Sequence, residues 1–229
     1  MKKISGPQFA KKATMPTRNM RGFSLLEMMI VVCIGLIMAA ITFISLQPAL
    51  KDGRVNNAYD TALSQMRTAR ERAVSERTRY IVSFGTTVPP LAIGQPVPTD
   101  QWSVATWVWR KAVPPNPDPP PTWVSTIELP NDILFQTVAG LPAAAPDGFG
   151  AGHVALDFDQ GVGAGGLNYV MFMPDGSVHD ELQNYNSGIL YMARSNDLYS
   201  SRAITVWGVT GRIRGWRLVQ APAFKWMEQ

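Results

Sequence analysis

The chain has 229 residues, of which 46% are hydrophobic and seven are tryptophan, so it is long and apolar enough to form one folded domain with a packed core. Its net charge of +4 and its pI near 9.3 would fit a nucleic-acid-binding protein, but residues 1–22 contain six lysines and arginines and no acidic residue. The rest of the chain has 15 basic and 17 acidic residues, so the overall basicity does not indicate a nucleic-acid partner for it.

Residues 1–22 form a basic leader that precedes an apolar segment. No Asp, Glu, Lys or Arg lies between Met28 and Leu46, and a helix of these residues is roughly 28 Å long, close to the hydrocarbon thickness of a membrane. The segment is longer than the apolar part of a secretory signal, and the plausible cleavage position, Gly22, lies before it. The basic leader predicts a cytoplasmic N-terminus, with the rest of the chain across the membrane.

The single cysteine, Cys33, lies inside this apolar segment and has no partner for an intramolecular disulfide. A lipoprotein signal would need a small residue before the cysteine, and Val32 stands there instead. Cys33 is therefore not predicted to carry a lipid.

The sequence Gly-Phe-Ser-Leu-Leu-Glu at residues 22–27, followed by the apolar segment, resembles the class III signal of type IV prepilins and type II secretion pseudopilins. The resemblance implies that a prepilin peptidase cleaves between Gly22 and Phe23 and that the new amino group of Phe23 is methylated. It also implies a bacterial inner-membrane protein with a periplasmic C-terminal domain, which then assembles with other pilin or pseudopilin subunits. Met15 and Met20 are alternative starts, and they change only the length of the leader.

Glu27 is the one charged residue at the edge of the apolar segment. After cleavage, the amine of Phe23 lies one helical turn away, and Glu27 can pair with the amine of a neighbouring subunit. Because an unpaired buried charge is costly, such a pair would set the register between subunits. The alternative is a carboxylate at a helix start, where the helix dipole favours it.

The predicted fold class is α+β: a long N-terminal helix, half transmembrane and half amphipathic, packed on an antiparallel β-rich domain. The predicted divisions are a leader at 1–22, a transmembrane and assembly helix at 23–50, an amphipathic extension at 51–79 and a pilin-like β domain at 80–229. The extension carries one apolar stripe at helical spacing: Val55, Tyr59, Ala62, Leu63, Met66, Ala69, Ala73 and Val74.

After residue 79 the sequence pattern predicts strands separated by turns and proline-rich or glycine-rich loops. The loops are predicted at 114–121, 140–152 and 161–166, and the turn at 174–177. The predicted strands cover residues 79–84, 102–109, 123–129, 133–138, 153–158, 168–173, 188–194, 203–209 and 212–219.

Two C-terminal segments carry a second resemblance. Phe-Met-Pro-Asp-Gly-Ser at 172–177 and Thr-Gly-Arg-Ile-Arg at 210–214 are similar to the C-terminal half of the GspH/FimT family of minor pseudopilins and pilins. The family's DNA-uptake members use a similar Gly-Arg-x-Arg element to bind DNA. By strand alternation Arg212, Arg214 and Trp216 share one face, where they could contact phosphates and stack on a base. The alternative is that these arginines cover apolar surface or pair with acids.

No catalytic or metal-binding constellation is evident. His153 and His179 have no partner at metal-ligand spacing, and Asp157 with Asp159 provides only part of a calcium loop. We therefore expect no enzyme activity and no cofactor. Two functions remain open: a minor structural subunit of a type II secretion pseudopilus or type IV pilus, or a DNA receptor on such a filament that uses Arg212 and Arg214.

Overall fold

Helix α1, Leu25–Ser75, is the first element of the protein, whose computed structural model describes residues 23–85, 103–110, 118–149, 154–158, 169–180, 182–220 and 222–229. The chain divides between Gln47 and Pro48 into two compact units. In the first unit every described residue is exposed, and the most apolar 18-residue stretch of α1 has a mean hydropathy of 2.7. By length and composition, α1 can cross a membrane.

In the second unit, α1 buries the apolar stripe that its sequence predicts. Seven of the eight predicted residues are buried, and Ala58, which was not predicted, is buried with them. Val74 is the exception: it is 45% exposed, although its neighbour Ala73 is fully buried. The β strands begin at Arg79, after α1 has ended at Ser75.

The second unit contains two antiparallel sheets. The first has the order β3-β2-β1-β6-β7, and the second has six strands in the order β11-β10-β9-β8-β4, with β5 also paired to β8. The strands of the first sheet are β1 (Arg79–Phe84), β2 (Ser103–Trp109), β3 (Thr122–Glu128), β6 (Tyr169–Phe172) and β7 (Val178–His179). Those of the second are β4 (Ile133–Leu134), β5 (Leu156–Phe158), β8 (Gly188–Arg194), β9 (Arg202–Trp207), β10 (Arg212–Gln220) and β11 (Phe224–Glu228). Two short 3-10 helices, η1 (Pro146–Gly148) and η2 (Leu198–Ser200), lie in the loops.

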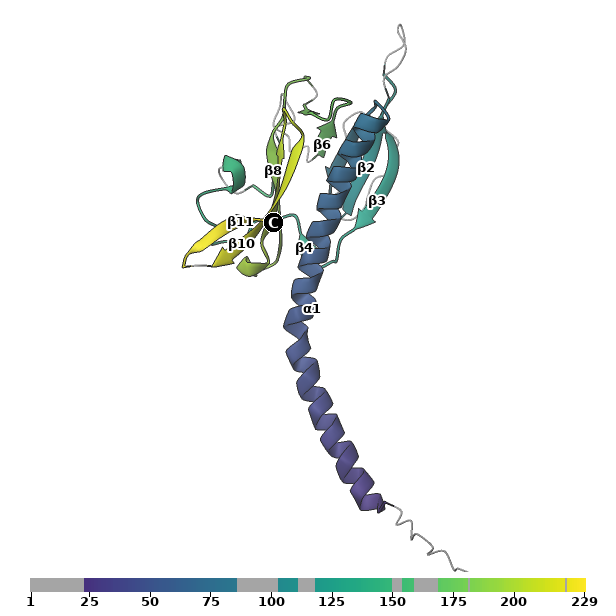
Figure 1. The fold of residues 1–229 in the computed structure, drawn as a ribbon, viewed down its shortest axis with the longest axis vertical. Helices are drawn as coiled ribbons and strands as arrows, with labels where there is room; N and C mark the ends of the chain where they lie inside the picture. The colour runs from purple at the N-terminus through teal and green to yellow at the C-terminus, as the bar shows by residue number, and fades with distance from the viewer. Residues whose placement is uncertain are drawn as a thin grey trace, which may run out of the picture. The chain divides into compact units, whose positions relative to one another are not determined.

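The main core lies where the second half of α1 packs between the two sheets (Figure 1). Alternate residues of each strand point into it, such as Val82 and Phe172 from the first sheet and Leu190 and Ile204 from the second. A smaller cluster covers the opposite face of the second sheet, which we call its outer face. That cluster contains Ile189, Tyr191, Ala203, Trp216, Trp226, Leu141 and Phe149.

The predicted fold class is confirmed: a long apolar N-terminal helix is followed by an antiparallel β domain. Some predicted strands are wrong in extent, since only Ile133 and Leu134 of segment 133–138 form a strand. The last strand, β11, was not predicted at all. It forms a hairpin with β10 and brings Trp226 to the outer-face cluster, and so short a segment shows no clear periodicity in its sequence.

Candidate functional site

The N-terminal motif lies partly within the described residues. Phe23 is 76% exposed, and Glu27 lies exposed in the first turn of α1. Glu27 forms no ion pair with any residue that the structure describes. Gly22 lies outside the described residues. The position of Glu27 thus leaves its carboxylate available to another molecule.

Strand β10 presents Arg212, Arg214 and Trp216 on the outer face of the second sheet. The intervening residues face α1: Ile213 packs on the main core, and a Cβ atom at Gly215 would lie 1.4 Å from the hydroxyl oxygen of Tyr59. Glycine is therefore required at 215, because the helix approaches the strand too closely for a side chain. This packing agrees with the prediction that Arg212, Arg214 and Trp216 share one face of the strand.

Arg214 is held by a buried carboxylate that sequence analysis did not identify. Asp147, in η1, has a side chain only 7% exposed, and its Oδ1 accepts a hydrogen bond of 2.8 Å from Nη1 of Arg214. Its Oδ2 accepts bonds from the hydroxyl of Thr205, at 2.6 Å, and from Nε1 of Trp207, at 3.1 Å. Nε of Arg214 also lies 3.3 Å from Oε1 of Glu228. The arginine therefore serves to fix the 141–149 segment to the sheet.

Trp216 is likewise engaged within the fold. Its indole Nε1 donates to Oγ1 of Thr205 at 2.9 Å, and its ring packs in the outer-face cluster. The polar edge of this tryptophan is thus already satisfied.

Arg212 differs from its two neighbours on this face. It is exposed, and within the described part of the chain no ion pair involves its guanidinium. The residue directly opposite it on β9 is Trp207, which is 41% exposed. Sequence analysis missed Trp207, because a two-residue turn at 210–211 would pair Arg212 with Val209, whereas the four residues 208–211 connect the strands.

The turn that carries Arg212 is fixed to α1 by Arg70. Nε of Arg70 donates to the carbonyl oxygen of Gly176 at 3.1 Å, and Nη2 donates to that of Thr210 at 3.0 Å. A Cβ atom at Gly211, whose φ is +60°, would lie 1.8 Å from the carbonyl oxygen of Gly176. One helix arginine therefore joins the two segments, 172–177 and 210–214, that carried the second sequence resemblance.

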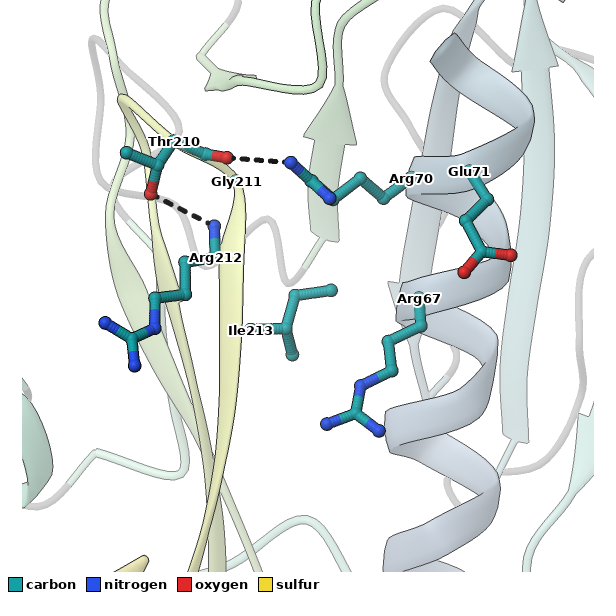
Figure 2. Close-up of a pocket in the computed structure, with 7 residues that line it drawn as sticks. All are labelled: Arg67, Arg70, Glu71, Thr210, Gly211, Arg212 and Ile213. Atoms are coloured by element: carbon teal, nitrogen blue, oxygen red, sulfur yellow. Dashed lines mark hydrogen bonds between the residues drawn. The ribbon is translucent and has the colours of Figure 1, made fainter. Parts of the chain in front are cut away.

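An open pocket of about 360 Å³ lies beside this turn, lined by Arg67, Arg70, Glu71, Thr210, Gly211, Arg212 and Ile213. Figure 2 shows that Arg70 reaches from α1 toward Thr210, whereas the guanidinium of Arg212 lies on the side of β10 away from α1. Arg212 thus points to the outer face and not toward Arg67.

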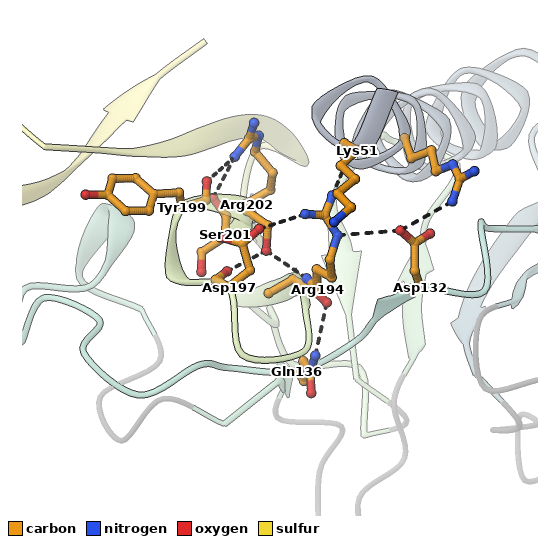
Figure 3. Close-up of polar contacts among 11 residues, drawn as sticks. Lys51, Asp132, Gln136, Arg194, Asp197, Tyr199, Ser201 and Arg202 are labelled. Carbon is orange, nitrogen blue, oxygen red and sulfur yellow. Dashed lines mark hydrogen bonds and ion pairs between the residues drawn. The ribbon is translucent and has the colours of Figure 1, made fainter. Parts of the chain in front are cut away.

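A second polar network ties the start of the second unit to the sheet (Figure 3). Arg194 donates from Nη2 to the carbonyl oxygen of Lys51 at 2.6 Å, and its Nη1 lies 2.7 Å from Oδ2 of Asp197. Nη2 of Arg202 donates to Oδ1 of Asn56 at 2.9 Å. Burial lowers the pKa of Arg202, which is only 2% exposed. Both arginines therefore bind α1 near residues 51–56.

The other residues considered above form no metal-binding group within the part of the chain that the structure describes. Asp175 belongs to the predicted turn, where the hydroxyl and the backbone N–H of Ser177 donate to its carboxylate and lower its pKa. Among the described residues there is no group of His, Cys, Asp and Glu arranged to hold a metal. His153, Asp159 and the glycines at 161–166 lie outside the described residues, as do residues 114–117 of the predicted proline-rich loop.

The N-terminal region matches a known family. Residues 17–43 match the sequence profile of the prokaryotic N-terminal methylation motif, and the chain carries this motif. A crystal structure of the type IV minor pilin FimU from Pseudomonas aeruginosa (strain PAO1) is similar with a TM-score of 0.38 and 9% sequence identity, covering 71% of this chain and 88% of that chain. No curated protein sequence matches the chain.

Proposed function

We propose that the protein is a non-catalytic subunit of a pilin-like filament, either a type IV pilus or a type II secretion pseudopilus. The proposal rests on one observation. The methylation motif at residues 17–43 overlaps the first part of α1, and the apolar side chains of α1 are all exposed up to Leu50. Such a surface needs lipid or other apolar helices around it. A membrane before assembly, and neighbouring subunits after it, provide these surroundings in turn.

In this proposal the leader is cytoplasmic and the second unit is periplasmic. A prepilin peptidase cleaves between Gly22 and Phe23, and the free amine of Phe23 is methylated. Phe23 directly precedes α1 and Glu27 lies in its first turn, so a new positive charge appears four residues from the carboxylate. Glu27 then pairs with the amine of a neighbouring subunit and sets the register of assembly.

The processing step is tested by co-expressing the full chain with a prepilin peptidase and measuring the intact mass. We expect a product that starts at Phe23 and carries one added methyl group, and we expect Gly22→Val to remain uncut. Gly35→Val, inside the apolar segment, is the matched control and should be cut normally. An uncut wild-type chain, in cells where the same peptidase processes another pilin, would refute the proposal.

The assembly step is tested by the variants Glu27→Ala and Glu27→Gln in a host that forms the filament. We expect both variants to be processed and to remain in the membrane, but to be lost from sheared filaments, because both lack the carboxylate. Glu76→Gln, which follows α1 in the second unit, is the control for loss of a negative charge. Normal amounts of Glu27→Ala in the filament would contradict the register role.

A second candidate function is a DNA receptor on the filament that acts through Arg212 and Arg214. The exposed guanidinium of Arg212, without an ion pair among the described residues, favours it. The ion pair between Arg214 and Asp147 instead favours a structural role for that arginine. A mobility-shift assay with the full chain in detergent separates the two roles. Complex formation at low salt that is lost in Arg212→Ala supports the receptor, and absence of any complex rejects it.

A further inference from the structure

The outer face of the second sheet ends in a cation and an aromatic ring placed side by side. Arg212 and Trp207 are directly opposite each other in the register of β9 and β10. Cross-strand neighbours have Cβ atoms about 4.5–5.5 Å apart. Both side chains are exposed, so a single ligand can contact the two together.

Trp207 is held in place before any ligand binds. Its Nε1 donates to the buried carboxylate of Asp147 at 3.1 Å, and Phe149 packs edge-on against it with ring centroids 5.1 Å apart. The ring nevertheless remains 41% exposed. An exposed aromatic side chain that is already ordered loses little conformational entropy when a ligand stacks on it.

We propose that Trp207 and Arg212 form a stacking site for single-stranded nucleic acid. Trp207 stacks on an unpaired base, and Arg212 contacts a neighbouring phosphate. Trp216 and Arg214 do not form this site, because Thr205 and Asp147 engage their polar groups. The inference rests on the second candidate function and identifies its ligand and its aromatic residue.

The preference for single strands follows from what each group can reach. The faces of the bases inside a duplex are covered by their neighbours, so a fixed ring can stack only on a base that is unpaired or at an end. Arg212 alone can contact the phosphates of either form. Stacking on Trp207 therefore adds affinity for single strands, and the phosphate contact adds affinity for both.

The test uses the full chain in detergent and measures fluorescence anisotropy with a labelled oligothymidine and with a duplex of equal length. We expect tighter binding of the single strand. Trp207→Ala should weaken single-strand binding about 5- to 100-fold with little effect on the duplex. Arg212→Ala should weaken both and reduce the salt dependence of single-strand binding by about 0.7 in the log–log slope. Trp207→Phe keeps a ring and should bind between wild type and Trp207→Ala.

Two variants are matched controls. Trp123, on β3 of the other sheet, is also 41% exposed, and Arg217 is an exposed arginine of β10 on its opposite face. Trp123→Ala and Arg217→Ala should bind as the wild type does. Circular dichroism melting identifies any variant that fails to fold, and Trp207→Phe then decides the result.

The outcomes separate the two ideas. If Arg212→Ala loses duplex binding while Trp207→Ala and Trp207→Phe bind every ligand normally, the stacking site is wrong and the DNA receptor stands. If the wild-type chain binds neither ligand at low salt, both are wrong. If oligonucleotide binding is unchanged in all variants but Trp207→Ala recovers fewer other filament subunits, the pair contacts protein, and the nucleic-acid inference is rejected.

Discussion

Asp147 is the residue on which the outer face of the second sheet depends. Its carboxylate receives hydrogen bonds from Arg214, Thr205 and Trp207, which come from two strands. Its own φ is +52°, an uncommon value for a residue other than glycine, so the loop is bent to bring the carboxylate over the sheet. Removal of this acceptor leaves a hydroxyl and an indole N–H without it and leaves the guanidinium of Arg214 with Glu228 alone.

We predict that Asp147→Ala lowers the free energy of unfolding by about 2–4 kcal/mol, because Arg214, Thr205 and Trp207 lose a shared buried acceptor. Urea titration followed by tryptophan fluorescence measures the change. Asp60→Ala, at an exposed position of α1, should change it by less than about 0.5 kcal/mol. The double variant Asp147→Ala with Arg214→Ala should cost less than the sum of the single changes, and strict additivity would show that the pair is not coupled.

Gly211 is predicted to be the least replaceable residue of the Gly-Arg-x-Arg element for stability. Gly211→Ala should cost about 2–4 kcal/mol, since its Cβ would overlap the carbonyl oxygen of Gly176 and its φ is positive. Gly53→Ala is the control, because it lies in α1 with no atom within 4 Å of the added methyl. Chemical denaturation should show Gly53→Ala slightly more stable than the wild type, by about 0.5–1 kcal/mol. Equal effects of the two changes would contradict the close approach of the turns.

Asp175 should make the stability of the folded protein depend on pH, and the direction follows from its lowered pKa. The bonds from Ser177 lower the pKa of Asp175 in the folded state. Its contribution to stability is therefore present above the unfolded pKa of about 4, and is lost as the pH falls through the lower folded value. We expect the loss of stability between pH 7 and pH 3 to be smaller in Asp175→Asn than in the wild type. Equal losses in the two proteins would show that Asp175 does not contribute.

At the scale of elements, the helices and strands that show a clear local periodicity were predicted from the sequence. The buried stripe of α1 and the strands at 79–84 and 188–194 follow from spacing and residue type, and β1 and β8 have these bounds. Sequence analysis did not predict Asp147, because the partners of its carboxylate lie 58 to 67 residues away in the chain. It missed Trp207 and β11 for another reason: both pair with β10 nearby in the chain, but the lengths of the connections are not evident from the sequence. Arg212 and Arg214 differ only in whether a distant carboxylate reaches them, and no local pattern encodes that difference.

The contacts of Arg194 with α1 lead to a prediction for the helix itself. Arg194→Ala should increase hydrogen exchange at residues 51–56, because the contact with the Lys51 carbonyl and the ion pairs with Asp132 and Asp197 are lost. Exchange at 62–69, which packs in the main core, should change much less. Arg67→Ala, at an exposed position of α1, is the control. Unchanged exchange at 51–56 would show that Arg194 does not hold this part of the helix.

At the scale of the whole molecule, the two units have different requirements for their surroundings. The second unit, Pro48–Gln229, contains every buried residue of α1 and both sheets. We predict that a chain starting at Pro48 is soluble without detergent and unfolds cooperatively, as light scattering and circular dichroism melting would show. The full chain should need detergent or lipid. Aggregation of the shorter chain would show that residues before Pro48 contribute to folding of the domain.

The clamp formed by Arg70 also has an evolutionary consequence. Its guanidinium donates to the carbonyl groups of Gly176 and Thr210, and Gly211, which follows Thr210, has no room for a side chain. Changes at positions 70, 176 and 211 should therefore be coupled across related sequences, because the arginine holds the two turns at the close approach that leaves residue 211 no room for a side chain. Covariation among these three positions should be stronger than their covariation with position 67, one turn earlier on the helix. It would identify relatives that share the contact between α1 and the two turns, even where overall sequence identity is low.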